Sequence, residues 1–251
     1  MTETAGEKAL ELPNIVTILA EKAKGTPLSD FLLTWQSLIF SLIIIMLLSV
    51  IAYVASRKIK EVPGRLQAAC ELFVGGVDDF VRGIIGDKAR IYTPFIGTLF
   101  IYILFMNLSG IVPLMKSPTS NWSTTMALTI CVMLYVFYVS IKEMGVIGYI
   151  DHLLGKPRGI IAFSVFIPLM MLVLHIVSDF IARPLSLSLR LRSNIWGDDM
   201  LLAVLSGFGA KGIPLLLFNT FLVILASIVQ TVVFCLLTTI YFTLVLTHEE
   251  T

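Results

Sequence analysis

Charged residues are scarce in this 251-residue sequence, where Asp, Glu, Lys and Arg together make up 14% of the chain. Soluble domains carry about 25% charged and about 45–50% apolar residues, whereas this chain is 57% hydrophobic with a mean hydropathy of +0.93. Its apolar residues gather in blocks long enough to cross a hydrocarbon core about 30 Å thick. The composition excludes an ordinary soluble domain and predicts an integral membrane protein.

Three further absences narrow the function. The net charge is only +1 and no basic stripe with interleaved aromatic residues occurs, so we expect no nucleic-acid partner. Cys70, Cys131 and Cys235 are few and far apart, which gives no disulfide framework and no metal cluster. The sequence also lacks a phosphate-binding loop and a nucleophile with an adjacent base. We therefore expect no cofactor, no metal and no enzymatic chemistry on this chain.

The apolar blocks predict an all-α membrane domain with about five embedded helices. Three spans are expected at residues 31–56, 92–115 and 126–141, and two longer stretches occupy residues 159–207 and 215–247. Both of these exceed the roughly 20 residues that a perpendicular span needs. We expect them to be tilted and to pack as an antiparallel hairpin.

Two segments differ from the spans. Residues 65–87 place apolar and charged side chains at helical spacing, which is typical of a helix lying on the membrane surface. Residues 1–30 mix acidic and basic residues with short apolar turns and lack the pattern of a signal peptide. We expect residues 31–251 to form one membrane domain, preceded by a separate N-terminal segment.

The basic residues of the loops predict the orientation. Loop 57–91 carries seven Lys and Arg residues and loop 142–158 carries three, whereas loop 116–125 and the turn near residue 211 carry one each. Loops rich in Lys and Arg stay in the cytoplasm. In a five-crossing chain the N-terminus is then outside and Thr251 inside.

Arginines interrupt the first of the two long stretches. An arginine at the bilayer centre costs about 2.5–3.5 kcal/mol on insertion scales, and its guanidinium cannot avoid this cost by losing a proton. Arg190 lies four residues after Ser186 and four before Asn194, so the three side chains share one polar strip. A charge in this place indicates an ion pathway, with an internal ion pair between helices as the alternative.

Ionisable residues flank Arg190 on both sides. Asp198 and Asp199 follow it by about two turns, and His175 and Asp179 share a face before it. Asp198 and Asp199 could act as a proton relay or form ion pairs with a neighbouring arginine. His175 and Asp179 could line an ion path or form a structural hydrogen bond.

The last apolar stretch carries its own polar strip. Asn219, Ser227 and Gln230 fall on one side, since 11 residues at 100° each bring Asn219 and Gln230 within about 20°. We expect Gln230 to face Arg190 across the hairpin and to hydrogen-bond its guanidinium. Asn107, at the end of the second span, lines an outer vestibule or caps the helix.

One motif resembles a known family. Residues 183–191, which read RPLSLSLRL, and the following Asn194 resemble the signature of subunit a of the F-type ATP synthase. Residues 63–67 with Glu71, residues 92–95, 107–113 and 124–128, and Gln230 agree with the same family. The resemblance covers about residues 31–247.

The resemblance implies the proton-conducting stator subunit beside a rotary c-ring, in a bacterial inner membrane. Its implied partners are the c-ring, the peripheral-stalk b subunits, the remaining ATP synthase subunits and membrane lipid, with ATP chemistry on other subunits. Arg190 is implied to face the carboxylate of each passing c subunit, where a fixed cation favours the ionised form and promotes proton release. Two aqueous half-channels are implied to meet the helix on either side of Arg190.

The implied channel residues follow from the same resemblance. Asp199 stands where the family carries Glu or His and is implied to relay protons in the outer half-channel. Asn107 and Asn219 are expected to line that path, while His175 and Asp179 are expected in the inner one.

Two positions depart from the family pattern. The usual Phe-Gly after the motif is Arg192-Ser193 here, and a histidine that several members carry in the last helix is Val223. Arg192 lies about 200° around the helix from Arg190, so we expect it to pair with an acid or to reach an interface. Val223 indicates that the outer path uses other groups.

Two other functions remain open. A stand-alone secondary transporter would use Arg190 to bind an anionic substrate, although such transporters commonly carry internal repeats and none is visible here. A structural membrane scaffold would leave the arginines unexplained.

Overall fold

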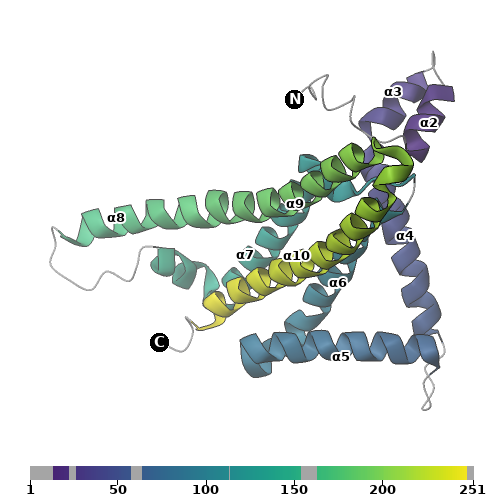
Figure 1. The fold of residues 1–251 in the computed structure, drawn as a ribbon. Coiled ribbons are helices and arrows are strands. Elements are labelled where there is room, and N and C mark those ends of the chain that lie inside the picture. Colours follow the sequence, from purple (N-terminus) through teal and green to yellow (C-terminus); the bar gives the residue numbers. More distant parts are fainter. Residues whose placement is uncertain (1–13, 23–26, 58–63, 113, 154–162, 248–251) are drawn as a thin grey trace.

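The computed structural model describes residues 14–22, 27–57, 64–112, 114–153 and 163–247 (Figure 1). These residues form helices and short turns without any strand, which confirms the predicted all-α class. The α-helices are α2 (Ile15–Lys22), α3 (Pro27–Thr34), α4 (Gln36–Ser56), α5 (Arg65–Ile85), α6 (Ala89–Leu108), α7 (Trp122–Leu153), α8 (Phe163–Ile176), α9 (Arg183–Ser206) and α10 (Ile213–Thr247). Short helical turns join them: η1 (Gly86–Lys88), η2 (Ser109–Ile111), η3 (Pro118–Ser120), η4 (Val177–Ala182) and η5 (Gly209–Gly212).

Among the described residues, five segments are long and apolar enough to cross a membrane, in agreement with the expected number of embedded helices. They are Gln36–Ser56, Ala89–Ile111, Trp122–Gly145, Leu169–Ser206 and Ile213–Leu244.

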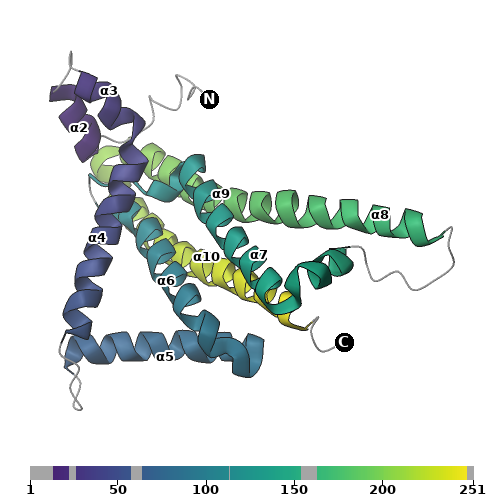
Figure 2. The same cartoon turned by 180° about the vertical axis from the view of Figure 1, so that it is seen from behind.

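The last two of these form a long hairpin that lies obliquely across the other helices. The helical run from α8 through η4 to α9 continues along one line, and α10 returns beside α9 (Figures 1 and 2). The amphipathic α5 begins near the C-terminal end of α4 and packs on α6 and α10. Residues 159–162 of the expected hairpin and residues 1–13 of the expected N-terminal segment lie outside the described residues.

The two ends of the molecule are built from different elements. The helices α2 and α3, the α6–α7 loop and the turn between α9 and α10 gather at one end, which we call the α2 end. Helix α5 and the C-terminal end of α10 lie at the other, the α5 end.

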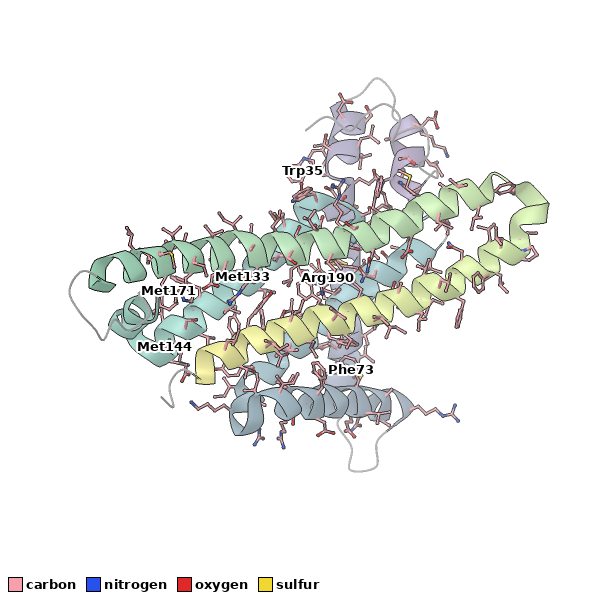
Figure 3. All side chains as sticks on the ribbon, turned by 60° about the vertical axis from the view of Figure 1, so that its left-hand side comes forward. Trp35, Phe73, Met133, Met144, Met171 and Arg190 are labelled. Atoms are coloured by element: carbon pink, nitrogen blue, oxygen red, sulfur yellow. The ribbon has the colours of Figure 1, made fainter. Side chains whose placement is uncertain are left out.

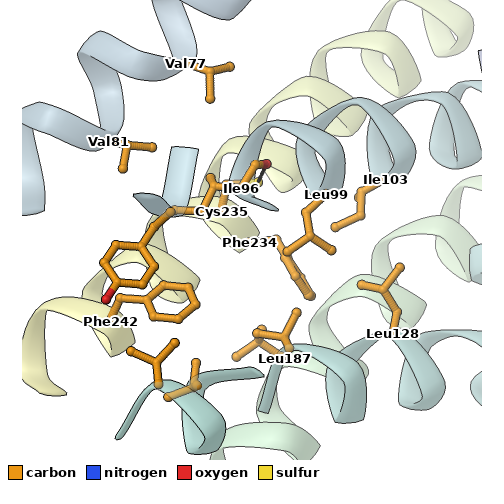
Figure 4. Packing of buried hydrophobic residues seen from close by; sticks show 14 of the residues in the cluster. Val77, Val81, Ile96, Leu99, Ile103, Leu128, Leu187, Phe234, Cys235 and Phe242 are labelled. Atoms are coloured by element: carbon orange, nitrogen blue, oxygen red, sulfur yellow. Dashed lines mark hydrogen bonds between the residues drawn. The ribbon is translucent and has the colours of Figure 1, made fainter. Parts of the chain in front are cut away.

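The core lies where α6, α7, α9 and α10 meet, with Val77 and Val81 of α5 at its edge (Figure 4). Leu187 and Leu191 of α9 pack with Phe234 of α10 and Ile103 of α6, and each of these side chains is at most 2% exposed. In lipid the hydrophobic effect does not drive helices together, so close van der Waals packing holds them instead. This packing fixes which face of α9 turns inward.

Residues 15–22 and 27–34 are helical, which sequence patterning did not reveal because α2 and α3 are only 8 residues each. The Asn14 side chain caps α2 by accepting a hydrogen bond from the Thr17 N–H at 3.0 Å. The Ile15 N–H donates to the Leu114 carbonyl at 2.9 Å. The N-terminal helices are thus docked onto the α6–α7 loop.

The third span differs from the expected residues 126–141. Helix α7 begins at Trp122 and runs to Leu153, with a kink at Gly145, where φ is 72° and ψ is 164°. Its polar residues from Lys142 onward were read as a loop, because the helix leaves the apolar part of the sequence before it ends.

The expected single stretch 159–207 is divided by a π-helical segment, Val177–Ala182. Pro184 follows directly, and a proline in an α-helix lacks an N–H donor and collides with the carbonyl four residues earlier. The wider π turn contains the carbonyl with which Pro184 would collide in a regular α-helix. Such π segments are frequent at functional sites.

We expect Gly145→Ala to destabilise the protein by about 1–3 kcal/mol, because its backbone conformation is nearly exclusive to glycine. Gly148→Ala is the matched control, since its added Cβ would meet only the Met144 Cβ at 3.5 Å in an ordinary contact. Denaturant unfolding of the detergent-solubilised protein, followed by circular dichroism, measures both. Equal stability of the two variants would contradict the kink.

Candidate functional site

Arg190 lies about halfway along the hairpin, on the exposed face of α9 (Figure 3). Ser186 and Asn194, the other members of the expected polar strip, are exposed on the same face. Within the described part of the chain, Arg190 has no hydrogen bond and no ion pair. The internal ion pair considered as the alternative is therefore absent there, and the guanidinium is presented outward.

Gln230 pairs with Asn194, not with Arg190 as expected. The Asn194 Nδ2 donates to the Gln230 Oε1 at 2.9 Å, and Gln230 is only 4% exposed. Asn194 lies one turn beyond Arg190 and occupies the amide oxygen that was expected to accept from the guanidinium. The Gln230 Nε2 is buried without a hydrogen-bond partner in the described structure.

The polar strip of α10 is buried against the rest of the hairpin. Asn219 and Ser227 are 4% and 0% exposed. The Asn219 Nδ2 and the Ser227 Oγ, like the Gln230 Nε2, have no hydrogen-bond partner among the described residues. Buried polar atoms are normally paired with protein or with ordered water. This strip therefore presents two amide donors and one hydroxyl without protein partners along one buried side of α10.

A small cavity of about 30 Å³ lies near the α2 end of the hairpin. Its walls bring together Asn107 of α6 and the adjacent Asp198 and Asp199 of α9, with Thr220 and Val223 of α10 opposite. A cavity needs about 10–15 Å³ of such volume to hold one water molecule. Val223, which replaces the histidine of several family members, therefore borders a site whose ionisable groups come from α9.

Asn107 does not act as a helix cap. The Thr119 Oγ1 donates to the Asn107 Oδ1 at 2.9 Å, and the Ser117 hydroxyl bonds both Thr119, at 2.7 Å, and the Met106 carbonyl, at 2.8 Å. Asn107 is 1% exposed, and its Nδ2 has no hydrogen-bond partner in the described structure. Ser117 and Thr119 were missed in the sequence because a polar loop gives no spacing that would assign a partner.

A second polar cluster lies on α8 and η4. The Arg183 guanidinium is 3.1 Å from the Asp179 Oδ1, and the His175 Nδ1 is 4.0 Å from the Asp179 Oδ2. Arg183 also lies over the Tyr241 ring, 4.9 Å from its centroid. His175 and Asp179 lie on one face, as expected, and Arg183 is an ion-pair partner of Asp179.

Tyr149, beyond the membrane-spanning part of α7, is electrostatically coupled to this cluster. Burial raises the pKa of its hydroxyl, Asp179 raises it further and Arg183 opposes both. The hydroxyl therefore stays protonated at neutral pH and is available as a hydrogen-bond donor.

The two clusters are separated along the helix. Asp179 and Asp199 are 20 residues apart, or roughly 30 Å at the rise of an α-helix. Between them α9 buries Leu187, Ser188 and Leu191, and the Ser188 hydroxyl lies 3.3 Å from that of Thr125. Between Arg183 and Asp198, the charged side chains are Arg190, which is exposed, and Arg192, which is partly buried.

Arg192 does not pair with an acid in the described part of the chain. Its Nε donates to the Ser120 carbonyl at 3.4 Å, and its guanidinium lies 5.4 Å from the centre of the Trp122 ring. Ser193, which stands in place of the usual glycine, is exposed. Arg192 and Ser193 thus both lie outside the buried face of α9, which includes Leu187, Leu191 and Ile195.

Comparison with known proteins identifies the family of this chain. The model of the ATP synthase A chain family matches residues 38–243. The chain belongs to this family. Among the relatives of this family, ATP synthase subunit a of Protochlamydia amoebophila is 38% identical over 96% of this chain and 90% of its own length. ATP synthase subunit a 3 of Pelobacter propionicus is 36% identical over 80% and 83%, and subunit a of a Sulfurihydrogenibium species is 32% identical over 86% and 99%.

We expect the Asn194–Gln230 contact to be detectable by crosslinking. In a chain with its three cysteines replaced, a short bifunctional thiol reagent should join Asn194→Cys to Gln230→Cys, because their side chains touch at 2.9 Å. Arg190→Cys paired with Gln230→Cys is the control and should react more slowly. Gel mobility measures both, and a faster control pair would contradict the geometry.

Proposed function

We propose that this chain is the proton-translocating subunit a of a rotary ATP synthase. Two aqueous half-channels open on opposite sides of the membrane, and Arg190 acts on the c-ring carboxylate between them. The observation that carries the proposal is the placement of Arg190, exposed and unpaired in the described structure, between two separated polar clusters on one helical run.

The outer half-channel begins at the α2 end. A proton enters at Asn107, Asp198 and Asp199, whose side chains share the small cavity. It continues along the buried strip of Asn219, Ser227 and Gln230, whose unpaired polar atoms support a water chain. This strip ends beside Asn194, one turn from Arg190.

The inner half-channel lies toward the α5 end and includes His175 and Asp179. A carboxylate held by Arg183 and approached by a histidine can exchange protons with water while its charge stays compensated. The buried Leu187 and Leu191 keep the two paths apart, which prevents a leak that would dissipate the gradient.

Arg190 separates the paths and acts on the rotor. Its guanidinium keeps its proton, so it cannot relay protons directly from one half-channel to the other. At about 4 Å two unit charges attract by roughly 4 kcal/mol at an effective dielectric of 20, which favours the ionised form of an approaching carboxylate. Ser186 and Asn194 extend the polar face that meets it.

The hairpin face supplies the rotor contact. Arg190 shares its exposed face with Leu185 and Leu189, and α10 exposes Phe221 and Leu225. These apolar side chains suit the c-ring and membrane lipid. The peripheral-stalk b subunits and the remaining ATP synthase subunits complete the assembly, and ATP chemistry takes place on those other subunits.

The orientation follows from the loop charges. The α5 end carries the basic loops and is cytoplasmic, and the α2 end with the N-terminal segment is outside. The membrane is a bacterial inner membrane. Each proton that crosses 100 mV releases about 2.3 kcal/mol, so several are needed for each ATP formed.

A stand-alone transporter that binds an anion at Arg190 is the second candidate. The exposed position of Arg190 argues against it, because a substrate site would be enclosed by the chain itself. Family membership also favours a subunit of a larger complex.

Arg190→Ala should abolish ATP-driven proton pumping in vesicles that contain the complete ATP synthase. ATP hydrolysis by the detached catalytic head should persist, because the substitution lies outside it. Arg190→Lys should also fail or nearly fail, since a lysine can lose its proton in a low-dielectric site. Fluorescence quenching of a pH-sensitive dye measures pumping, and normal pumping by Arg190→Ala would refute the assignment.

The two half-channels should be accessible from opposite sides. In the cysteine-free chain, we expect Asp199→Cys to react with a water-soluble thiol reagent from outside and His175→Cys to react from the cytoplasmic side. Right-side-out vesicles present the outer side of the membrane to the reagent, and inverted vesicles present the cytoplasmic side. If both positions react from the same side, the arrangement of the half-channels and the proposed orientation are wrong.

A further inference from the structure

The α6–α7 loop is tied to α9 by a residue outside the proposed proton path. Arg192 is partly buried, points away from the Arg190 face, and contacts both the loop and the start of α7. Its Nε donates to the carbonyl of Ser120, and its guanidinium lies over Trp122, the first residue of α7. Arginine can form both contacts at once because its planar guanidinium stacks on an aromatic ring while its edge donates hydrogen bonds.

The contact continues from the loop to the wall of the cavity. Ser120 belongs to η3, and its neighbour Thr119 is fully buried and donates to the Asn107 Oδ1. Ser117, at the start of the same turn, is bonded to Thr119 and to the Met106 carbonyl. The polar side of Asn107 is therefore held by the loop segment that Arg192 fixes.

The loop also packs closely against the acidic side of the cavity. A Cβ placed on Gly110 would lie 3.3 Å from the Ser117 Cβ and 3.6 Å from the Asp199 Oδ1. Because so little space separates the loop, Gly110 and Asp199, a displacement of the loop changes the width of the cavity directly.

We propose that Arg192 is a positioning residue, which clamps the α6–α7 loop onto α9 and so sets the spacing between Asn107 and Asp199 in the outer half-channel. The assignment of the cavity to that half-channel rests on the proposed function, but the clamp itself does not. Arg192 stands where the family resemblance leads one to expect phenylalanine, which would pack there without a donor for the Ser120 carbonyl.

The clamp can be tested with a reporter that leaves Asn107, Asp198 and Asp199 in place. Thr220→Cys puts a thiol on the cavity wall, and Ser178→Cys puts one on η4 at the distant cluster. Each is introduced into the cysteine-free chain, assembled in the complete complex and reconstituted in vesicles. The rate at which a water-soluble thiol reagent labels each reporter is then compared between the chain that retains Arg192 and the chains that carry Arg192→Leu or Arg192→Lys.

We expect Arg192→Leu to speed the labelling of Thr220→Cys by about two- to fivefold, the range that corresponds to a cation–π contact at a partly exposed site. Labelling of Ser178→Cys should not change. Arg192→Lys should show a smaller effect, because the ammonium retains the attraction to the Trp122 ring. Trp122→Leu should also speed the labelling of Thr220→Cys, and adding Arg192→Leu to it should have little further effect, since both remove the same contact.

Three results would overturn the proposal. The first is an unchanged rate at Thr220→Cys, and the second is an equal increase at both reporters, which indicates loosening of the whole fold. The third is an Arg192→Lys variant indistinguishable from Arg192→Leu. Labelling does not depend on proton flow, so failure of the proposed function would appear separately, as normal pumping by Arg190→Ala.

Discussion

A guanidinium that cannot lose its proton has to be accommodated within a membrane, and the arrangement of the other elements is consistent with this constraint. Helix α9 satisfies this constraint because one side of it is apolar and buried while the other side is exposed and carries the charge. Leu187 and Leu191 are buried in the core, while Arg190 faces outward. The charge is then available to a partner, and the apolar side of the same helix is the packed wall between the two polar clusters.

The length of the hairpin determines how this wall is presented. Helix α10 has 35 residues and is therefore roughly 52 Å long, against a hydrocarbon core of about 30 Å. It has to tilt, and the oblique course of α9 and α10 spreads their polar residues sideways as well as across the membrane. The stacked rings of Tyr92 and Phe242, with centroids 5.1 Å apart, fasten its C-terminal part to α6.

The sequence was most informative where one segment alone decides the outcome. Apolar length predicted five embedded helices and a long hairpin. Helical spacing predicted that His175 shares a face with Asp179 and that Ser186, Arg190 and Asn194 share another. It failed where segments distant in the chain choose their partners. The Asn194–Gln230 bond and the contact of Arg192 with Trp122 depend on how helices dock, which spacing along one helix does not encode.

The π-helical segment before α9 has a consequence for how this region can vary. Each π turn holds about one residue more than an α turn, and one residue corresponds to about 100° of helical rotation. The extra residue is therefore held within about the same rotation, and deletion of one residue within Val177–Ala182 would restore regular α-helix and leave the faces of α8 and α9 in their present register. Conversion of the segment to α-helix without a deletion would instead turn the faces of α8 by about 100° relative to Arg190. The segment thus sets the rotation of α8 relative to α9 within one helical run.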